Sequence, residues 1–368
     1  MRFGKTMLVL CSLLVTACGG QSNSGRVFAP HYEPTTRSAT IRFVGDVMQH
    51  KPQIDAAWQD GRYDYTSCFA PVATLLSEAD LTIANLETTL RTTPPFSGYP
   101  LFAAPSELAA ALADAGVDVA LLANNHICDR GGKGLRSTIG ILDSLGIAHT
   151  GAFADLPDYA RNNPLSVKVG GFNIAIMNYT YGTNGMPTAK GTFVNRIDTT
   201  RIALDMQRAR TADIRLVCIH WGQEYAQRPH KAERQLAEWL YQKGATAIIG
   251  GHPHVMQPVE IRSDRNGTTQ GVTFFSLGNF VSNQIWEATD GGMVATLHFE
   301  QTDNQPLRIT PSWEYVWVHK RYENGRLRYS VLPLHNHEQT VTDSTLWRLR
   351  RFERLSRKFS TADTVIVN

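Results

Sequence analysis

The stretch Phe43-Val44-Gly45-Asp46 is a short apolar run that ends abruptly in a carboxylate. A run of this kind between polar residues is typical of a buried β-strand. In α/β sheets, ligand and catalytic groups collect beyond the carboxyl ends of the strands, because the loops there converge on one crevice. The stretch therefore predicts a strand and, at its end, one side chain of a site.

The same arrangement recurs four times along the chain, where an apolar run ends in a residue able to bind a metal ion. One such residue alone is more often capped or solvated than a ligand, but several at strand ends can meet in space. Imidazoles, carboxylates and an amide oxygen suit Zn, Mn or Fe, and their number suffices for one ion or two bridged ions. The runs are Leu81–Leu86 before Glu87, Ala120–Ala123 before Asn124, Asn125 and His126, Leu216–Ile219 before His220, and Ile248–Gly251 before His252 and His254.

From residue 39 onward, short apolar runs alternate with amphipathic stretches, which is typical of an α/β fold in which helices cover sheets. The expected strands are 40–45, 81–85, 117–123, 172–179, 214–219 and 245–249, and the expected helices are 106–115, 134–145, 199–209 and 232–243. Later segments at 272–275, 293–299, 309–318 and 327–332 are β-rich with few helices between them, so we expect a second, more antiparallel sheet. A basic helix is expected at 341–359, with its charge on a solvated face or against a membrane surface.

The N-terminus has a short basic region followed by an apolar stretch too brief to span a bilayer, which indicates a secretory signal. It ends in Val15-Thr16-Ala17-Cys18, which looks like a bacterial lipobox and predicts lipidation of Cys18. We therefore expect a lipoprotein signal peptide at 1–17, a lipidated cysteine and flexible tether at 18–38, a folded domain at 39–335 and a helical extension at 336–368. The protein would be exported and anchored by lipid to the outer membrane or to the outer face of the cytoplasmic membrane.

Charge and cysteine content limit the classes of partner. The formal net charge is +3, and Arg2 and Lys5 would leave with the signal, so no nucleic-acid partner is expected. Cys68, Cys128 and Cys218 are an odd number outside the signal and lipobox, so they cannot all pair within one chain. Buried thiols explain them better than metal ligands do.

Six motifs occur in an order that resembles the poly-γ-glutamate capsule biosynthesis (CapA) family. Six ordered motifs are far more specific than any one of them, and they span roughly residues 40 to 285. The motifs are Val44–Met48, Asn85–Glu87, Asn124–Gly131, His220–Tyr225, Gly251–Gln257 and Ser276–Phe280.

This family in turn resembles calcineurin-like metallophosphatases, which implies a four-layer α-β-β-α sandwich with mixed sheets, here followed by a C-terminal helix. The resemblance places two divalent ions at one edge of the sandwich. It implies Asp46 and His254 as ligands of one ion, Asn125, His220 and His252 as ligands of the other, and Glu87 as the bridge. His126 would act beside the metal shell as a general acid or charge stabiliser, with Asp129 orienting its ring.

One departure concerns the first motif. Metallophosphatases generally carry histidine two residues after the first aspartate, whereas this chain has Met48. A thioether is a poor ligand for hard or borderline cations, so a single-metal centre is an alternative to two ions, unless the nearby His50 substitutes. Glu224 could be a further metal ligand, a proton shuttle or a partner of Arg228, and the catalytic or substrate-contact interpretation is favoured. Trp221, Tyr225, Asn279 and Arg130 could contact substrate, although packing, turn formation or surface exposure explains them nearly as well.

Two functions follow from the resemblance. In the first, a metal-activated water attacks a phosphoester or amide bond of an anionic envelope polymer or its precursor, so the protein is a hydrolase. In the second, the protein handles polymer without catalysis as a subunit of a membrane-bound synthase and export complex. A purely structural metal remains a third interpretation.

Overall fold

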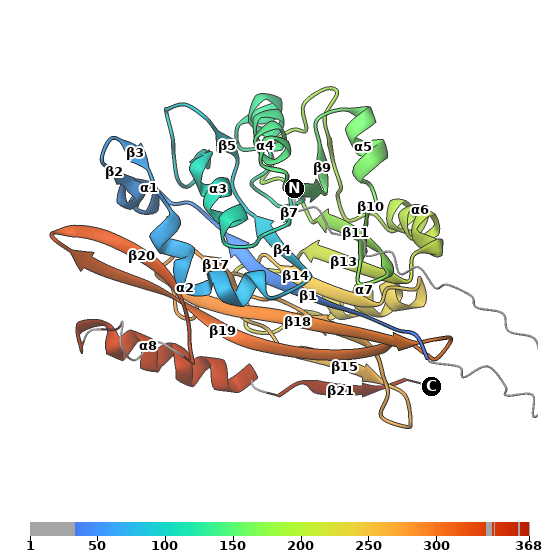
Figure 1. The fold of residues 1–368 in the computed structure, drawn as a ribbon. Coiled ribbons are helices and arrows are strands. Elements are labelled where there is room, and N and C mark those ends of the chain that lie inside the picture. Colours follow the sequence, from blue (N-terminus) through green and yellow to red (C-terminus); the bar gives the residue numbers. More distant parts are fainter. Residues whose placement is uncertain (1–33, 336–340, 342, 360, 368) are drawn as a thin grey trace, which may run out of the picture. The chain divides into compact units, whose positions relative to one another are not determined.

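The structure, a computed structural model, describes residues 34–335, 341, 343–359 and 361–367 (Figure 1). The expected signal, Cys18 and the tether up to residue 33 lie outside the described residues. The first strand, β1 (Thr36–Val47), begins three residues before the expected start of the domain, because Thr36 already pairs with Thr302 on a neighbouring strand. No helix among the described residues has the length and apolar character needed to cross a bilayer.

The first sheet combines parallel and antiparallel strands. Its order is β20-β19-β18-β1-β4-β7-β8, and β17 also pairs with β1. β1 runs parallel to β4 and antiparallel to β18, so it is the boundary between the two kinds of pairing. The remaining strands are β4 (Leu81–Leu86), β7 (Val119–Leu121), β8 (Ala148–Thr150), β17 (Asn279–Val281), β18 (Gly291–Thr302), β19 (Arg308–Glu323) and β20 (Arg326–Pro333).

The second sheet has a parallel centre and antiparallel flanks. Its order is β10-β11-β13-β14-β16-β15-β21, with β11, β13, β14 and β16 parallel to one another. The strands are β10 (Leu165–Val169), β11 (Phe172–Thr180), β13 (Ile214–His220), β14 (Ala247–Gly251), β15 (Val259–Ser263), β16 (Thr269–Phe274) and β21 (Asp363–Ile366). Three two-stranded ribbons join β2 (Trp58–Gln59) to β3 (Arg62–Tyr63), β5 (Leu90–Arg91) to β6 (Ala104–Pro105), and β9 (Ala152–Phe153) to β12 (Phe193–Val194).

Helices cover the outer face of each sheet (Figure 1). The first sheet packs against α2 (Thr66–Ser77), α3 (Glu107–Asp114) and α4 (Gly131–Leu145), and the second against α6 (Thr199–Arg208) and α7 (Lys231–Gln242). Shorter helices are α1 (Lys51–Ala57), α5 (Leu156–Asn162) and the 3-10 turns Ala209–Thr211 and Arg357–Phe359, and α8 (Asp343–Ser356) follows the last strand of the first sheet.

Side-chain alternation along the strands explains this layering. On β1, Ile41 and Phe43 enter the apolar core between the two sheets, whereas Val44 enters the core under α2 to α4. On β13, Leu216 faces the same central core and Val217 faces α6 and α7. Strands buried on both faces read as continuous apolar runs, as the sequence does here. The expected four-layer α-β-β-α sandwich with mixed sheets and a C-terminal helix is confirmed.

One expectation about the sheets is wrong. The late strands β18, β19 and β20 do not form a second sheet, because they extend the first sheet from the free edge of β1. The hairpin strand β18 pairs with β1 over nine residues, from Thr36 to Val44, and this long register fixes its place. The second sheet is built instead around the middle of the chain, with β16 as its only member from the late β-rich segments that the sequence singled out.

Candidate metal centre

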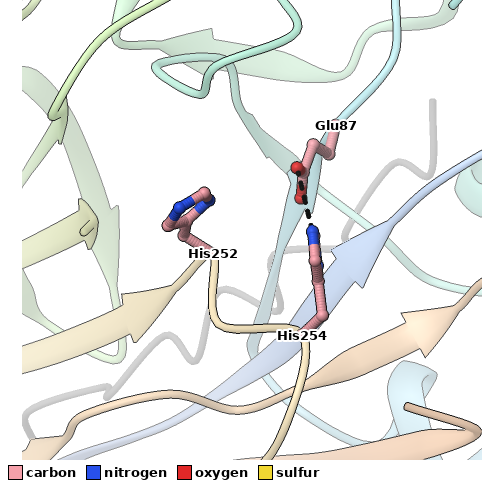
Figure 2. Close-up of side chains that lie close together, drawn as sticks. All are labelled: Glu87, His252 and His254. Atoms are coloured by element: carbon pink, nitrogen blue, oxygen red, sulfur yellow. Dashed lines mark ion pairs between the residues drawn. The ribbon is translucent and has the colours of Figure 1, made fainter. Parts of the chain in front are cut away.

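The predicted ligands come from strand ends of both sheets. Asp46 lies at the end of β1 and Glu87 directly follows β4, while His220 closes β13. His252 and His254 lie on the loop after β14, and Figure 2 shows Glu87 facing His254 from the other sheet. Because the sheets pack face to face, the carboxyl ends of their parallel strands meet at one edge.

Two groups of side chains have the geometry of a metal site. Asp46, Glu87 and His220 form one, and Glu87, His252 and His254 form the other, with all ligand atoms within 4.8 Å of one another in each group. Glu87 belongs to both groups, which is the place of a bridging ligand. The groups divide the histidines differently from the resemblance, because His220 lies with Asp46. The donors suit one or two divalent ions of the Mn, Zn or Fe type.

Asn85 and Asn125 complete this cluster. The side chain of Asn125 lies 2.9 Å from His220 Nε2 through its Oδ1. Asn85 donates to Asp46 Oδ1 at 2.7 Å and lies 3.3 Å from His220 Nδ1. Asn85 was not predicted as a site residue, although it stands on β4 two residues before Glu87, and alternate residues of an extended chain share a face.

The electrostatics of the cluster favour a cation. Burial and the neighbouring Asp46 and Glu224 raise the pKa of Glu87 well above its usual value. Burial lowers the pKa of His220, and it lowers that of His252 to about 3. Among the described residues, Glu87 Oε1 and His252 Nδ1 are buried without a hydrogen-bond partner. Such groups are costly unless something binds them, and a divalent ion would satisfy both. The residues therefore fit a metal.

The loop that carries the histidines has an unusual backbone. His252 and His254 have φ of 97° and 58°, a left-handed region that non-glycine residues seldom adopt. The His252 N–H donates to Asp46 Oδ2 at 3.3 Å, and His254 Nδ1 lies 3.0 Å from the same oxygen. A Cβ on Gly251 would lie 2.8 Å from Asp46 Oδ1, so a larger residue would displace the carboxylate. The strained turn thus places the His252 backbone N–H and the His254 imidazole against the aspartate.

His126 and Asp129 form a buried pair beside the cluster. His126 Nδ1 lies 2.8 Å from Asp129 Oδ2, and that oxygen also accepts from the Phe102 N–H at 2.7 Å. The Phe102 ring packs edge-on against the imidazole, with ring centroids 4.5 Å apart. These contacts fix the orientation of the His126 ring.

Met48 and His50 belong to neither ligand group. The Met48 sulfur lies 3.8 Å from Ser282 Oγ, and His50 Nδ1 accepts from the Asn283 N–H at 3.3 Å. Burial lowers the pKa of His50 to about 4. Both side chains therefore contact the loop after β17.

The remaining predicted residues line the rim or hold the fold. Glu224 is exposed on the loop after β13, and no ion pair with Arg228 occurs among the described residues. The neighbouring Tyr225 ring lies 6.2 Å from both His254 and Trp286. Trp221 is buried with its indole N–H on the Phe275 carbonyl at 2.9 Å, and Asn279 donates to the Thr289 carbonyl at 2.8 Å, so both have structural contacts.

Tyr181 is a rim residue that the sequence argument missed. Its ring lies 4.5 Å from His252 and 6.3 Å from His220, and about half of the residue is exposed (45%). It directly follows β11, as His220 ends β13, so its place at a strand end was the available signal.

The structure is thus an α-β-β-α sandwich with a buried cluster of carboxylates and imidazoles at one edge. The family described as bacterial capsule synthesis protein PGA_cap matches residues 40–284. The chain is 30% identical over 275 residues to the PGA biosynthesis protein CapA of Bacillus subtilis, a match that covers 73% of this chain and 70% of the relative. The chain belongs to this capsule synthesis family.

The chain is also similar to a second capsule protein and to a solved structure. The capsule biosynthesis protein CapA of Bacillus anthracis is 27% identical over 325 residues, which cover 84% of this chain and 75% of that protein. Among solved structures, a 5'-nucleotidase from Candida albicans is similar with a TM-score of 0.42 and 12% identity. The match covers 77% of this chain and 52% of the nucleotidase.

Proposed function

We propose that this protein is a metal-dependent hydrolase that cleaves a phosphoester or amide bond in poly-γ-glutamate, in a related anionic envelope polymer, or in a precursor. The observation that supports this proposal is the convergence of Asp46, Glu87, His220, His252 and His254, two of whose buried atoms lack a hydrogen-bond partner among the described residues. The names of the two Bacillus relatives support the polymer and its biosynthesis as the context.

The chain's own residues divide the work. Asp46, Glu87, Asn125, His220, His252 and His254 would hold one or two divalent ions. When bound, such an ion supplies an activated water and polarises the scissile bond. His126 holds a proton for the leaving group, and Asp129 fixes the ring that carries it. Glu224 and Tyr181 stand at the rim, where they would contact the substrate.

The test uses the purified protein with defined metals, a model phosphoester and a γ-linked glutamate polymer. We expect His220→Ala to lose bound metal and turnover together, whereas His126→Gln keeps its metal and loses about 10²- to 10⁴-fold in turnover. The matched control is His335→Ala, which changes an exposed histidine outside the site. Absence of turnover by the wild-type protein on both substrates with every metal would refute the hydrolase.

A second function is favoured by Met48 and by the contact of His50 with Asn283, since the first metal position then lacks one histidine donor. In this function the protein handles polymer as a non-catalytic subunit of a membrane-bound synthase and export complex. A His220→Ala protein that binds no metal and still supports capsule formation in cells would establish it over the hydrolase.

We also propose that the protein is exported and held at the envelope by a lipid on Cys18. The motif Val15-Thr16-Ala17-Cys18 supports this proposal. Cys18→Ser is expected to move the protein from the membrane fraction to the soluble fraction, measured by cell fractionation. Cys11→Ser, which changes a cysteine earlier in the signal, is the control and should leave the distribution unchanged.

A further inference from the structure

A cavity lies outside the metal cluster, between the chain that leaves β4 and the start of α4. Its volume is about 340 Å³. Residues from both segments line it, and most of them are polar or charged. These are Thr89, Arg91, Thr92, Thr93, Arg130, Lys133 and Ser137. The wall thus offers three cations and four hydroxyls, and no acidic side chain among the described residues lines it.

The charges of this cavity are not neutralised within the described part of the chain. None of Arg91, Arg130 and Lys133 forms an ion pair with a described carboxylate. Arg91 donates to the Pro95 carbonyl at 2.9 Å, and Arg130 donates to the Leu101 carbonyl at 2.7 Å and to the Ser97 hydroxyl. These acceptors are neutral and do not exhaust the five N–H groups of a guanidinium. The bonds orient the two arginines and leave their positive charge available.

Both segments that line the cavity continue along the chain from residues of the candidate site. Thr89 lines the cavity two residues after Glu87, and its hydroxyl donates to the Phe102 carbonyl at 2.6 Å. Arg130 directly follows Asp129, whose carboxylate accepts from the Phe102 N–H. The same loop residue, Phe102, therefore braces the chain after Glu87, the His126–Asp129 pair and the cavity wall.

We infer that this cavity is a carboxylate-binding subsite for an anionic polymer whose scissile bond lies at the metal centre. The inference rests on the proposed function, because it takes the polymer as the substrate. Three cations at separate points of one wall match a chain that carries a carboxylate on every unit, and guanidinium groups bind carboxylates at two points. Occupation of the subsite sets the register of the polymer relative to the metal.

Free phosphate is the other source of the same negative charge. A single tetrahedral anion would need one tight cradle, whereas the three cations here come from Arg91 on one segment and from Arg130 and Lys133 on another. Cations that come from two separate chain segments favour consecutive carboxylates over one phosphate. Comparing the affinity for a γ-linked glutamate decamer with that for inorganic phosphate distinguishes the two sources of negative charge.

The experiment measures binding of a γ-linked glutamate decamer to the full-length protein by calorimetry at fixed ionic strength. It is done in the His220→Ala background, so that no metal or turnover is required. Among the described residues, Lys133 has no hydrogen bond or ion pair that a substitution would remove. Lys133→Gln should weaken decamer binding about threefold to fivefold, the size of one exposed ion pair. Arg130→Gln should weaken it further because a two-point contact is lost.

The matched control is Arg136→Gln on the same helix. Arg136 loses the same charge but does not line the cavity, so decamer binding should stay unchanged. Three outcomes would each overturn the subsite. They are equal weakening by Arg136→Gln and Lys133→Gln, no weakening by either cavity variant, and tighter binding of inorganic phosphate than of the decamer. If the decamer binds as expected while wild-type protein shows no turnover, the subsite stands and the hydrolase fails.

Discussion

Glu87 is the central residue of the candidate metal centre. It is fully buried, it lies in both candidate ligand groups, and its Oε1 has no hydrogen-bond partner among the described residues. A buried carboxylate beside Asp46 destabilises the fold unless a cation or a proton neutralises it. The candidate ligand Glu87 is therefore also expected to affect the stability of the fold.

Glu87→Gln separates the two roles. The amide keeps the shape of the side chain and removes the buried charge, so we expect metal affinity to fall and the metal-free fold to gain stability at pH 7. Chelation should lower the melting temperature of the wild-type protein, since a ligand that binds only the folded state stabilises it by about 3–4 kcal/mol at 100 to 1,000 times its Kd. The same chelator should leave Glu87→Gln nearly unchanged in thermal denaturation, and an equal drop in both proteins would contradict the assignment.

The candidate site could be predicted from sequence where a ligand directly ends an apolar run, as with Asp46, Glu87 and His220. Asn85 and Tyr181 escaped that argument for different reasons. Asn85 stands inside a strand and makes its contacts through the alternation of faces, whereas Tyr181 contacts His252 across two chain segments. A contact between distant chain segments, such as Tyr181 with His252, depends on tertiary packing, which a local sequence pattern does not predict.

At the scale of elements, α8 is attached to β19 by a titratable contact. His319 on β19 is fully buried, lies 3.2 Å from Thr345 on α8, and stacks on Trp317 with ring centroids 5.1 Å apart. Burial, together with the nearby Arg321, lowers the pKa of His319 to about 4. In the unfolded chain the imidazole has its ordinary pKa near 6.5.

This difference predicts a stability loss in mild acid. Between pH 6.5 and 4 the unfolded chain takes up a proton at this position and the folded chain does not, so stability falls as the pH is lowered. Across this window the free energy of unfolding should fall by an amount on the order of 3 kcal/mol. His319→Gln removes the titration, and its unfolding free energy from urea melts should depend less on pH across this window. An unchanged slope would show that His319 is protonated in the folded protein.

Two glycines give a matched pair of element-scale predictions. A Cβ on Gly45 in β1 would lie 2.0 Å from the Gly278 carbonyl oxygen, so Gly45→Ala should destabilise by about 1–3 kcal/mol or more. A Cβ on Gly140, in the interior of α4, would meet open space, so Gly140→Ala should stabilise by about 0.5–1 kcal/mol. Chemical denaturation measures both, and effects of equal sign would contradict the close approach of β1 to the Gly278 turn.

Most elements were predictable because their apolar spacing is local. β1, β4, β11, β13 and β14 contain the expected runs, and α3, α4, α6 and α7 follow the expected periodicity. α2 was missed, and its interior Pro71 weakens the helical pattern. The assignment of β18 to β20 to the first sheet was not predictable, since strand order depends on which free edge a hairpin reaches.

At the scale of the whole molecule, the candidate metal centre contains residues of both sheets. Asp46 and Glu87 come from the first sheet, whereas His220, His252 and His254 come from the second. Below them the sheets share one apolar core that includes Phe43 and Leu216. An ion at the edge would thus cross-link the two sheets, while the apolar core keeps them packed without it. Metal removal is expected to loosen this edge and to leave the sandwich folded.

The left-handed turn at His252 and His254 decides where that loosening begins. Such backbone conformations cost on the order of 1–3 kcal/mol each and persist only while surrounding contacts enforce them. With the cation gone, the imidazoles lose the strongest of those contacts and the turn can relax. Deuterium uptake after chelation should therefore rise first in residues 251–255, while the amides of β13 and β14 exchange as slowly as before. Backbone strain held in the ligand loop would therefore speed dissociation of the ion.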